Sequence, residues 1–185
     1  MENDHINGEY DDYKDLRKFL IKNNQISFAN NIDNTYKKVL VLSSASYFES
    51  IISAHIINYA EKSSGADKRI VKLIENKVVE RQYHTLFDWK TKNTNKFWSL
   101  FGDDTKDKVR KQIDSNKDLK TAEQAFIELG NLRNLLVHEN LAEYDVNTTF
   151  EEIYNRYKSA CVFVSFVKKV LDPDYIKSRP LNEIF

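Results

Sequence analysis

An arginine, an asparagine and a histidine occur together in one leucine-rich stretch of the chain, residues 129–139. Arg133 can present a planar, permanently charged fork to phosphate oxygens. His138 can exchange a proton near neutral pH, because the unperturbed pKa of histidine is about 6.5. Asn134 can hold either the imidazole or the phosphate by hydrogen bonds. This combination indicates proton transfer beside a bound phosphodiester.

The surrounding residues predict that this stretch is a helix. Three leucines at i, i+3 and i+7 would bury one side of it: Leu129, Leu132 and Leu136. On such a helix Asn134 and His138 lie about 40° apart, whereas Arg133 lies about 140° from His138. The arginine must therefore use its long side chain to reach the same place. The predicted site lies beside a seam of the core.

The resemblance to a known family is carried by residues 133–138, RNLLVH. They resemble the Arg-Asn-x-x-x-His signature of the HEPN superfamily, and one more long apolar segment follows them. HEPN proteins are small helical domains, and many are metal-independent endoribonucleases of toxin–antitoxin and antiphage systems. The resemblance implies attack of the RNA 2′-hydroxyl on phosphorus, which leaves a 2′,3′-cyclic phosphate. His138 would be general base or acid, and Arg133 would stabilise the phosphate and the transition state.

The resemblance also implies partners. One motif supplies a single histidine, whereas attack and departure need two proton-transfer groups. In the HEPN arrangement two protomers pair about a two-fold axis, so we expect a homodimer through the motif helix. Gly130 costs about 1 kcal/mol relative to Ala inside a helix, which predicts a close approach by another backbone, such as the partner helix. RNA and an antitoxin or immunity protein are the other expected partners.

A carboxylate on an earlier helix could complete the site. Glu49 stands among apolar residues at positions 47, 48, 51 and 52. There it could orient the catalytic histidine or arginine from a neighbouring helix, as acidic residues do in families that the sequence resembles. The alternative is that Glu49 emerges at the polar edge of its own helix.

The middle of the chain is predicted to bind RNA. Residues 62–120 carry 15 Lys and Arg against 9 Asp and Glu, although the formal net charge of the whole chain is zero. The basic residues of this region could contact the RNA backbone or could form a solvated surface. Trp89 could stack on an unpaired base or pack into the bundle. The candidate RNA-binding residues are Lys68, Arg69, Lys72, Lys77, Arg81 and Trp89.

Length and composition predict one all-α domain. The chain has 185 residues, enough for one well-buried core, with only 4 Gly and 2 Pro. We expect a bundle of about five to seven helices. The predicted parts are an N-terminal polar segment and short helix (1–32), a HEPN-like helical domain (33–172) and a C-terminal tail (173–185). Residues 1–12 are expected to fray, and caps are expected at Asp33 or Asn34 and at Thr121.

Other features favour a cytoplasmic protein without cofactors. Cys161 is the one cysteine, so no intramolecular disulfide can form, as is usual in a reducing compartment. The amino terminus has no apolar signal-peptide core, and no apolar run approaches the roughly 18 residues of a membrane span. No metal-binding motif or glycine-rich phosphate loop is present, so we expect neither a metal nor a cofactor.

Two functions remain open from the sequence. The first is a metal-independent HEPN endoribonuclease. The second is a non-catalytic HEPN module that binds a nucleotide or a partner protein and uses Arg133 only to hold an anion.

Overall fold

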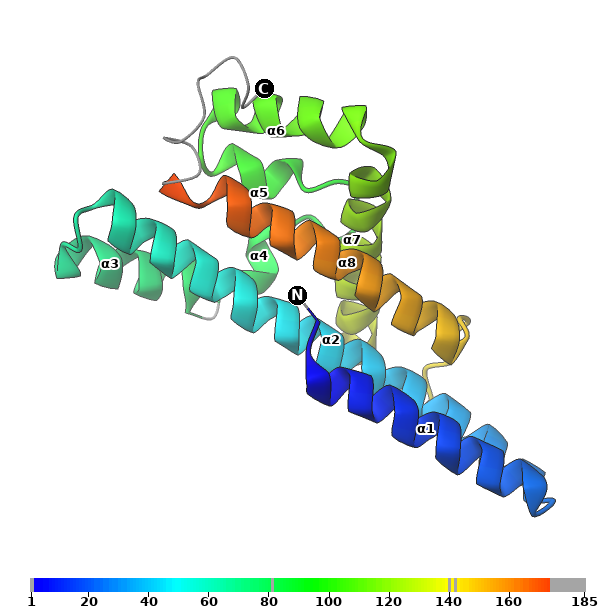
Figure 1. Ribbon diagram of the computed structural model, residues 1–185. Helices are drawn as coiled ribbons and strands as arrows, with labels where there is room; N and C mark the ends of the chain where they lie inside the picture. Colours follow the sequence, from blue (N-terminus) through cyan, green and yellow to red (C-terminus); the bar gives the residue numbers. More distant parts are fainter. Residues whose placement is uncertain (1, 81, 140, 142, 174–185) are drawn as a thin grey trace.

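The computed structural model describes residues 2–80, 82–139, 141 and 143–173, and within this part of the chain every regular element is helical (Figure 1). The all-α prediction is confirmed. The described residues form eight α-helices and a π-helical turn, η1. This number is larger than the predicted five to seven helices, because the structure also contains two very short helices, α4 and α5, of 4 and 5 residues. The elements are α1 (Asp4–Lys22), α2 (Ile26–Ser63), α3 (Lys68–Ile74), η1 (Glu75–Val79), α4 (Tyr83–Leu86), α5 (Asn95–Ser99), α6 (Asp103–Ser115), α7 (Lys117–His138) and α8 (Phe150–Val170).

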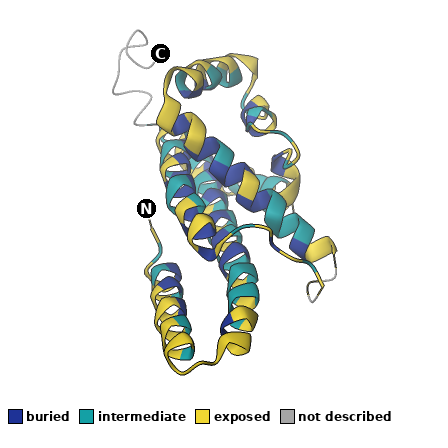
Figure 2. Cartoon of the chain, turned by 90° about the vertical axis from the view of Figure 1, so that its right-hand side faces the viewer, coloured by how far each residue is buried: buried dark blue, intermediate teal, exposed yellow. Residues whose placement is uncertain are grey.

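Three long helices, α2, α7 and α8, form the core. Phe48 of α2 lies with its ring centroid 5.8 Å from that of Phe126 on α7 and 5.8 Å from that of Tyr157 on α8. All three side chains are almost fully buried, and the buried faces of the helices meet inside the bundle (Figure 2). Each such side chain contributes about 1.5–3 kcal/mol through the apolar surface that it removes from water. This core fixes the orientation of α7, which carries the motif.

The first helix begins earlier than the sequence predicts. Residues 4–12 are helical, because Asn3 caps α1 by accepting hydrogen bonds from the backbone N–H groups of His5 and Ile6. The expectation that residues 1–12 fray is therefore wrong for those that α1 contains. Ile6, Tyr10 and Tyr13 are buried. Tyrosine combines a large apolar ring with a hydroxyl, so an acidic, tyrosine-containing segment can still bury one face.

Two other helix starts also differ from the predicted caps. Asp33 lies inside α2 and accepts hydrogen bonds from the Tyr13 hydroxyl at 2.6 Å and from Arg17 at 3.0 Å, which ties α1 to α2. The motif helix begins at Lys117, where Asn116 accepts a bond from the Leu119 N–H at 3.0 Å. The predicted cap of the motif helix, Thr121, instead lies one turn inside α7. Both helices thus begin earlier in the chain than the predicted caps.

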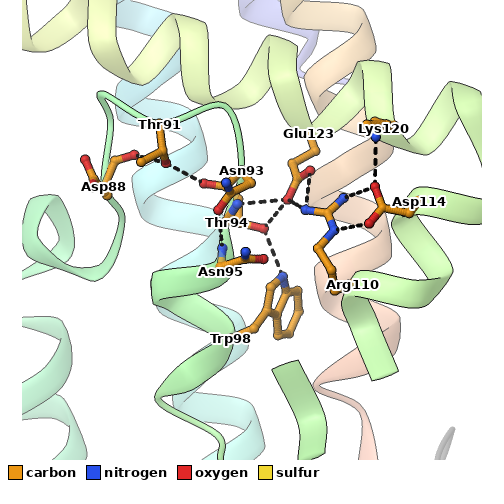
Figure 3. Close-up of polar contacts among 10 residues, drawn as sticks. All are labelled: Asp88, Thr91, Asn93, Thr94, Asn95, Trp98, Arg110, Asp114, Lys120 and Glu123. Atoms are coloured by element: carbon orange, nitrogen blue, oxygen red, sulfur yellow. Dashed lines mark hydrogen bonds and ion pairs between the residues drawn. The ribbon is translucent and has the colours of Figure 1, made fainter. Parts of the chain in front are cut away.

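A buried polar network attaches α5 and α6 to the first half of α7 (Figure 3). Glu123 of α7 is only 1% exposed. It accepts hydrogen bonds from the backbone N–H and the hydroxyl of Thr94, at 2.8 and 2.7 Å, and from Arg110 of α6 at 3.0 Å. Trp98 donates its indole N–H to the Thr94 hydroxyl at 3.0 Å. The network thus anchors the half of α7 that precedes the motif.

Helix α2 is long and apolar enough to cross a membrane by length and composition alone. In its most apolar window, 39% of the residues are buried inside the protein. A core helix of a soluble protein can meet the same criteria, so length and composition alone do not show that α2 crosses a membrane.

Candidate active site

A narrow cleft lies where α2, α4 and α7 meet. Its polar residues come from three separate parts of the chain: Glu49 from α2, His84 from α4, and Arg133 and Asn134 from α7. Its water-accessible volume is about 20 Å³, which is enough for one water molecule. Its other lining residues are Ala45, Phe48, Tyr83, Trp89, Phe126 and Gly130.

Arg133 and Asn134 are joined in this cleft. The Arg133 guanidinium donates a hydrogen bond from Nη1 to Oδ1 of Asn134 at 3.1 Å. Both side chains are half-buried. In the free protein, Asn134 therefore holds the arginine, whereas the sequence predicts that it holds His138 or the phosphate. The bond fixes part of the guanidinium and leaves its other N–H groups to bind an anion.

His138 lies apart from these groups. It is the last residue of α7, it is exposed, and it does not line the cleft. It is five positions after Arg133, which corresponds to about 140° around the helix and about 7.5 Å along its axis. The structure thus brings together three of the four predicted catalytic residues, Glu49, Arg133 and Asn134, and places His138 at the adjoining helix end.

Trp89 forms one wall of the cleft and packs directly over Gly130. Its indole N–H donates to the backbone carbonyl of His84 at 2.8 Å, and its ring centroid lies 4.9 Å from that of Phe87 and 5.7 Å from that of Phe126. A Cβ atom added at Gly130 would lie 1.9 Å from the indole ring. The close approach predicted at Gly130 is therefore made by this side chain, and the expectation of a backbone is wrong.

Comparison with known proteins shows the family to which this chain belongs. The model of one protein family, RiboL-PSP-HEPN, matches residues 9–172. The chain belongs to this family. No curated protein and no solved structure matches it. The predicted membership of the HEPN superfamily is thus confirmed by a match that covers α7, α8 and most of α1.

Two cleft residues of this HEPN chain, Tyr83 and His84, are not among the site residues that the sequence predicts. Burial raises the pKa of the Tyr83 hydroxyl well above its ordinary value, the negative charge of Glu49 raises it further, and the positive charge of Arg133 lowers it. Both charges thus act on this buried hydroxyl. The only signal in the sequence is a histidine within an aromatic stretch, and that pattern does not indicate which helix it faces.

The predicted RNA-binding lysines and arginines lie on α3 and η1, outside the cleft of the HEPN domain. Lys68 and Lys77 are exposed. Arg69 pairs with Asp67 at 2.8 Å, and Lys72 pairs with Glu75 at 2.7 Å. Such exposed pairs are weak and can be exchanged for phosphate contacts. Arg81 lies outside the described residues.

Within the described part of this HEPN chain, no group of three or more His, Cys, Asp or Glu side chains is arranged to hold a metal ion.

Gly130→Ala should destabilise the HEPN domain by about 1–3 kcal/mol, because the new methyl group displaces the Trp89 indole. In a Trp89→Ala background the same substitution should instead stabilise it by about 1 kcal/mol, the ordinary advantage of Ala over Gly in a helix. Urea unfolding of the wild type, both single variants and the double variant measures the effect. An equal change in both backgrounds would contradict the packing of Trp89 on Gly130.

Proposed function

We propose that this protein is a metal-independent endoribonuclease of HEPN type, which cuts RNA by attack of a 2′-hydroxyl and leaves a 2′,3′-cyclic phosphate. The observation that carries the proposal is the half-buried Arg133, held by Asn134 in a cleft beside Glu49, in a chain of the RiboL-PSP-HEPN family. By analogy with the HEPN enzymes that it resembles, we further propose that it serves as the toxin or effector of a bacterial toxin–antitoxin or antiphage system.

In the proposed reaction Arg133 binds the phosphate and stabilises the charge that develops on it. A guanidinium can donate two parallel hydrogen bonds to phosphate oxygens and stays charged at all physiological pH values. Asn134 limits the conformations open to the guanidinium before RNA arrives, which reduces the entropy lost on binding. His138 removes the proton from the 2′-hydroxyl. Its exposed position at the helix end leaves it accessible to a ribose that lies along α7.

We propose that two protomers pair around the helix end that carries His138. Val137 is exposed beside the histidine, and Val39 and Leu141 are also exposed and line one shallow groove. An apolar surface around a polar functional group is typical of an interface. Pairing would place two copies of Arg133 and His138 beside one RNA strand. An antitoxin or immunity protein could cover the same surface.

The RNA is proposed to extend from the cleft onto the basic residues of α3 and η1, which include Lys68 and Lys77. Backbone contacts of this kind add affinity without sequence preference, and they weaken as salt concentration rises. Trp89 contributes as a cleft wall in the free protein, and its stacking on a base would require the indole to leave Gly130.

One observation favours a second candidate function, a non-catalytic HEPN module that binds a nucleotide or partner protein. The imidazole of His138 lies outside the cleft that holds Arg133. A site that uses Arg133 and Asn134 only to bind an anion would need no histidine.

Cleavage of total RNA and of a tRNA pool in EDTA distinguishes these functions. We expect the purified wild type to produce fragments, and His138→Ala to reduce the rate by about 10²–10⁴-fold, the usual contribution of a proton-transfer group. The matched control is His5→Ala, because His5 is exposed on α1 and outside the cleft. Equal cleavage by wild type and His138→Ala would indicate a contaminant. No cleavage by a well-folded wild type would favour the binding module.

A further inference from the structure

We propose that His84 is the general acid that protonates the leaving 5′-oxygen when RNA is cut; this assignment rests on the ribonuclease function proposed above. Among the described residues that line the cleft with Arg133, His84 is the only one with an imidazole. The cleft is therefore lined by a cation that could bind phosphate and by a histidine, both from the same protomer.

The local structure holds the backbone of His84 in place. Its backbone carbonyl accepts the indole N–H of Trp89 at 2.8 Å. Its neighbours in α4, Tyr83 and Leu86, are buried and anchor the short helix to the core. His84 itself is exposed and is among the residues that line the cleft. The position of the residue is thus fixed by its surroundings, while its side chain remains open to solvent.

The proposed step balances as follows. His138 accepts the proton of the 2′-hydroxyl, and the 2′-oxygen forms a bond to phosphorus. The bond between phosphorus and the 5′-oxygen breaks, and its electron pair remains on that oxygen. His84 then donates a proton to the 5′-oxygen. Solvent returns a proton to His84 and removes one from His138, so both groups are ready for another cycle.

Within one protomer, His84 lines the cleft that contains Arg133, and His138 does not. The motif histidine of the same chain is about 140° around α7 from Arg133. His84 already shares a cleft with Arg133 and Asn134. The two-protomer arrangement can then serve RNA binding without supplying the acid.

The test uses an RNA oligonucleotide whose scissile 5′-oxygen is replaced by sulfur. A thiolate leaves without protonation, so loss of the general acid should no longer matter, whereas loss of the base should. We expect His84→Ala and His84→Gln to cut the ordinary RNA about 10²–10⁴-fold more slowly than the wild type. On the sulfur-containing RNA both should approach the wild-type rate, while His138→Ala stays slow on both substrates. His5→Ala is the control variant.

Three results would overturn the assignment. His84 variants that are equally slow on both substrates would show a structural or phosphate-binding role. Variants with wild-type activity on the ordinary RNA would exclude His84 from the reaction, and rescue of His138→Ala by sulfur would make His138 the acid. If the wild type cuts neither RNA, the proposed ribonuclease function fails, and the assignment of His84 fails with it.

Discussion

Arg133→Ala should reduce kcat/KM for RNA cleavage by about 10²–10³-fold, the usual effect of removing one donor that stabilises charge in a transition state. The guanidinium is half-buried in the cleft, where water screens its charge less than at an open surface. Arg133→Lys should recover only part of the activity, because lysine retains the charge but not the planar fork. Initial cleavage rates over a range of RNA concentrations measure the effect.

A matched control separates this effect from a general loss of positive charge. Arg156 of α8 is partly exposed, pairs with Glu128 at 3.2 Å, and lies outside the cleft. Arg156→Ala should therefore leave kcat/KM within about threefold of the wild type. An Arg133→Ala protein that is folded and retains more than half of the wild-type activity would contradict the role proposed for the guanidinium.

Glu123→Ala should lower the free energy of unfolding by about 3–5 kcal/mol, the usual cost of breaking a buried ion pair by removing one partner. The carboxylate is 1% exposed and accepts bonds from Arg110 and from two groups of Thr94. After its removal the Thr94 donors lose their buried acceptor, and Arg110 keeps only its bonds to Asp114. Urea unfolding followed by circular dichroism measures the change.

Two further variants make this second prediction specific. Glu123→Gln keeps an oxygen that can accept from Thr94 but loses the charge beside Arg110, so it should cost less than Glu123→Ala. Glu128 is a carboxylate on the same helix whose side chain is 53% exposed and pairs with Arg156. Glu128→Ala should cost no more than about 1 kcal/mol. Similar losses for Glu123→Ala and Glu128→Ala would contradict the special contribution of the buried network.

Features set by local periodicity could be predicted from the sequence. The apolar spacing of α2 and α8 and the low content of Gly and Pro led to an all-α fold. The last helix begins after Thr149, where Thr149 and Glu152 form a capping box, a Thr-x-x-Glu pattern that is visible in the sequence. The six-residue motif led to the HEPN superfamily, and the family match confirms that membership.

Features that depend on contacts between distant segments could not be predicted. Tyr10 and Tyr13 stand among acidic residues, so periodicity gave no indication that α1 packs on the bundle. Glu49 could be placed on its helix, but its position in a cleft with His84 and Arg133 depends on how three helices cross. The same holds for Gly130, whose neighbour Trp89 is 41 residues earlier in the chain. Local spacing contains no information about such pairs.

The most direct test of the proposed chemistry is cleavage, in EDTA, of two RNA oligonucleotides that differ by one oxygen atom. One carries the ordinary ribose at the cleavage site, and the other carries a single 2′-deoxyribose there. We predict that the wild type cuts only the first and leaves a 2′,3′-cyclic phosphate or its hydrolysed 3′-phosphate. Cleavage of both oligonucleotides at the same site, or fragments with a 5′-phosphate and a free 3′-hydroxyl, would contradict attack by the 2′-hydroxyl.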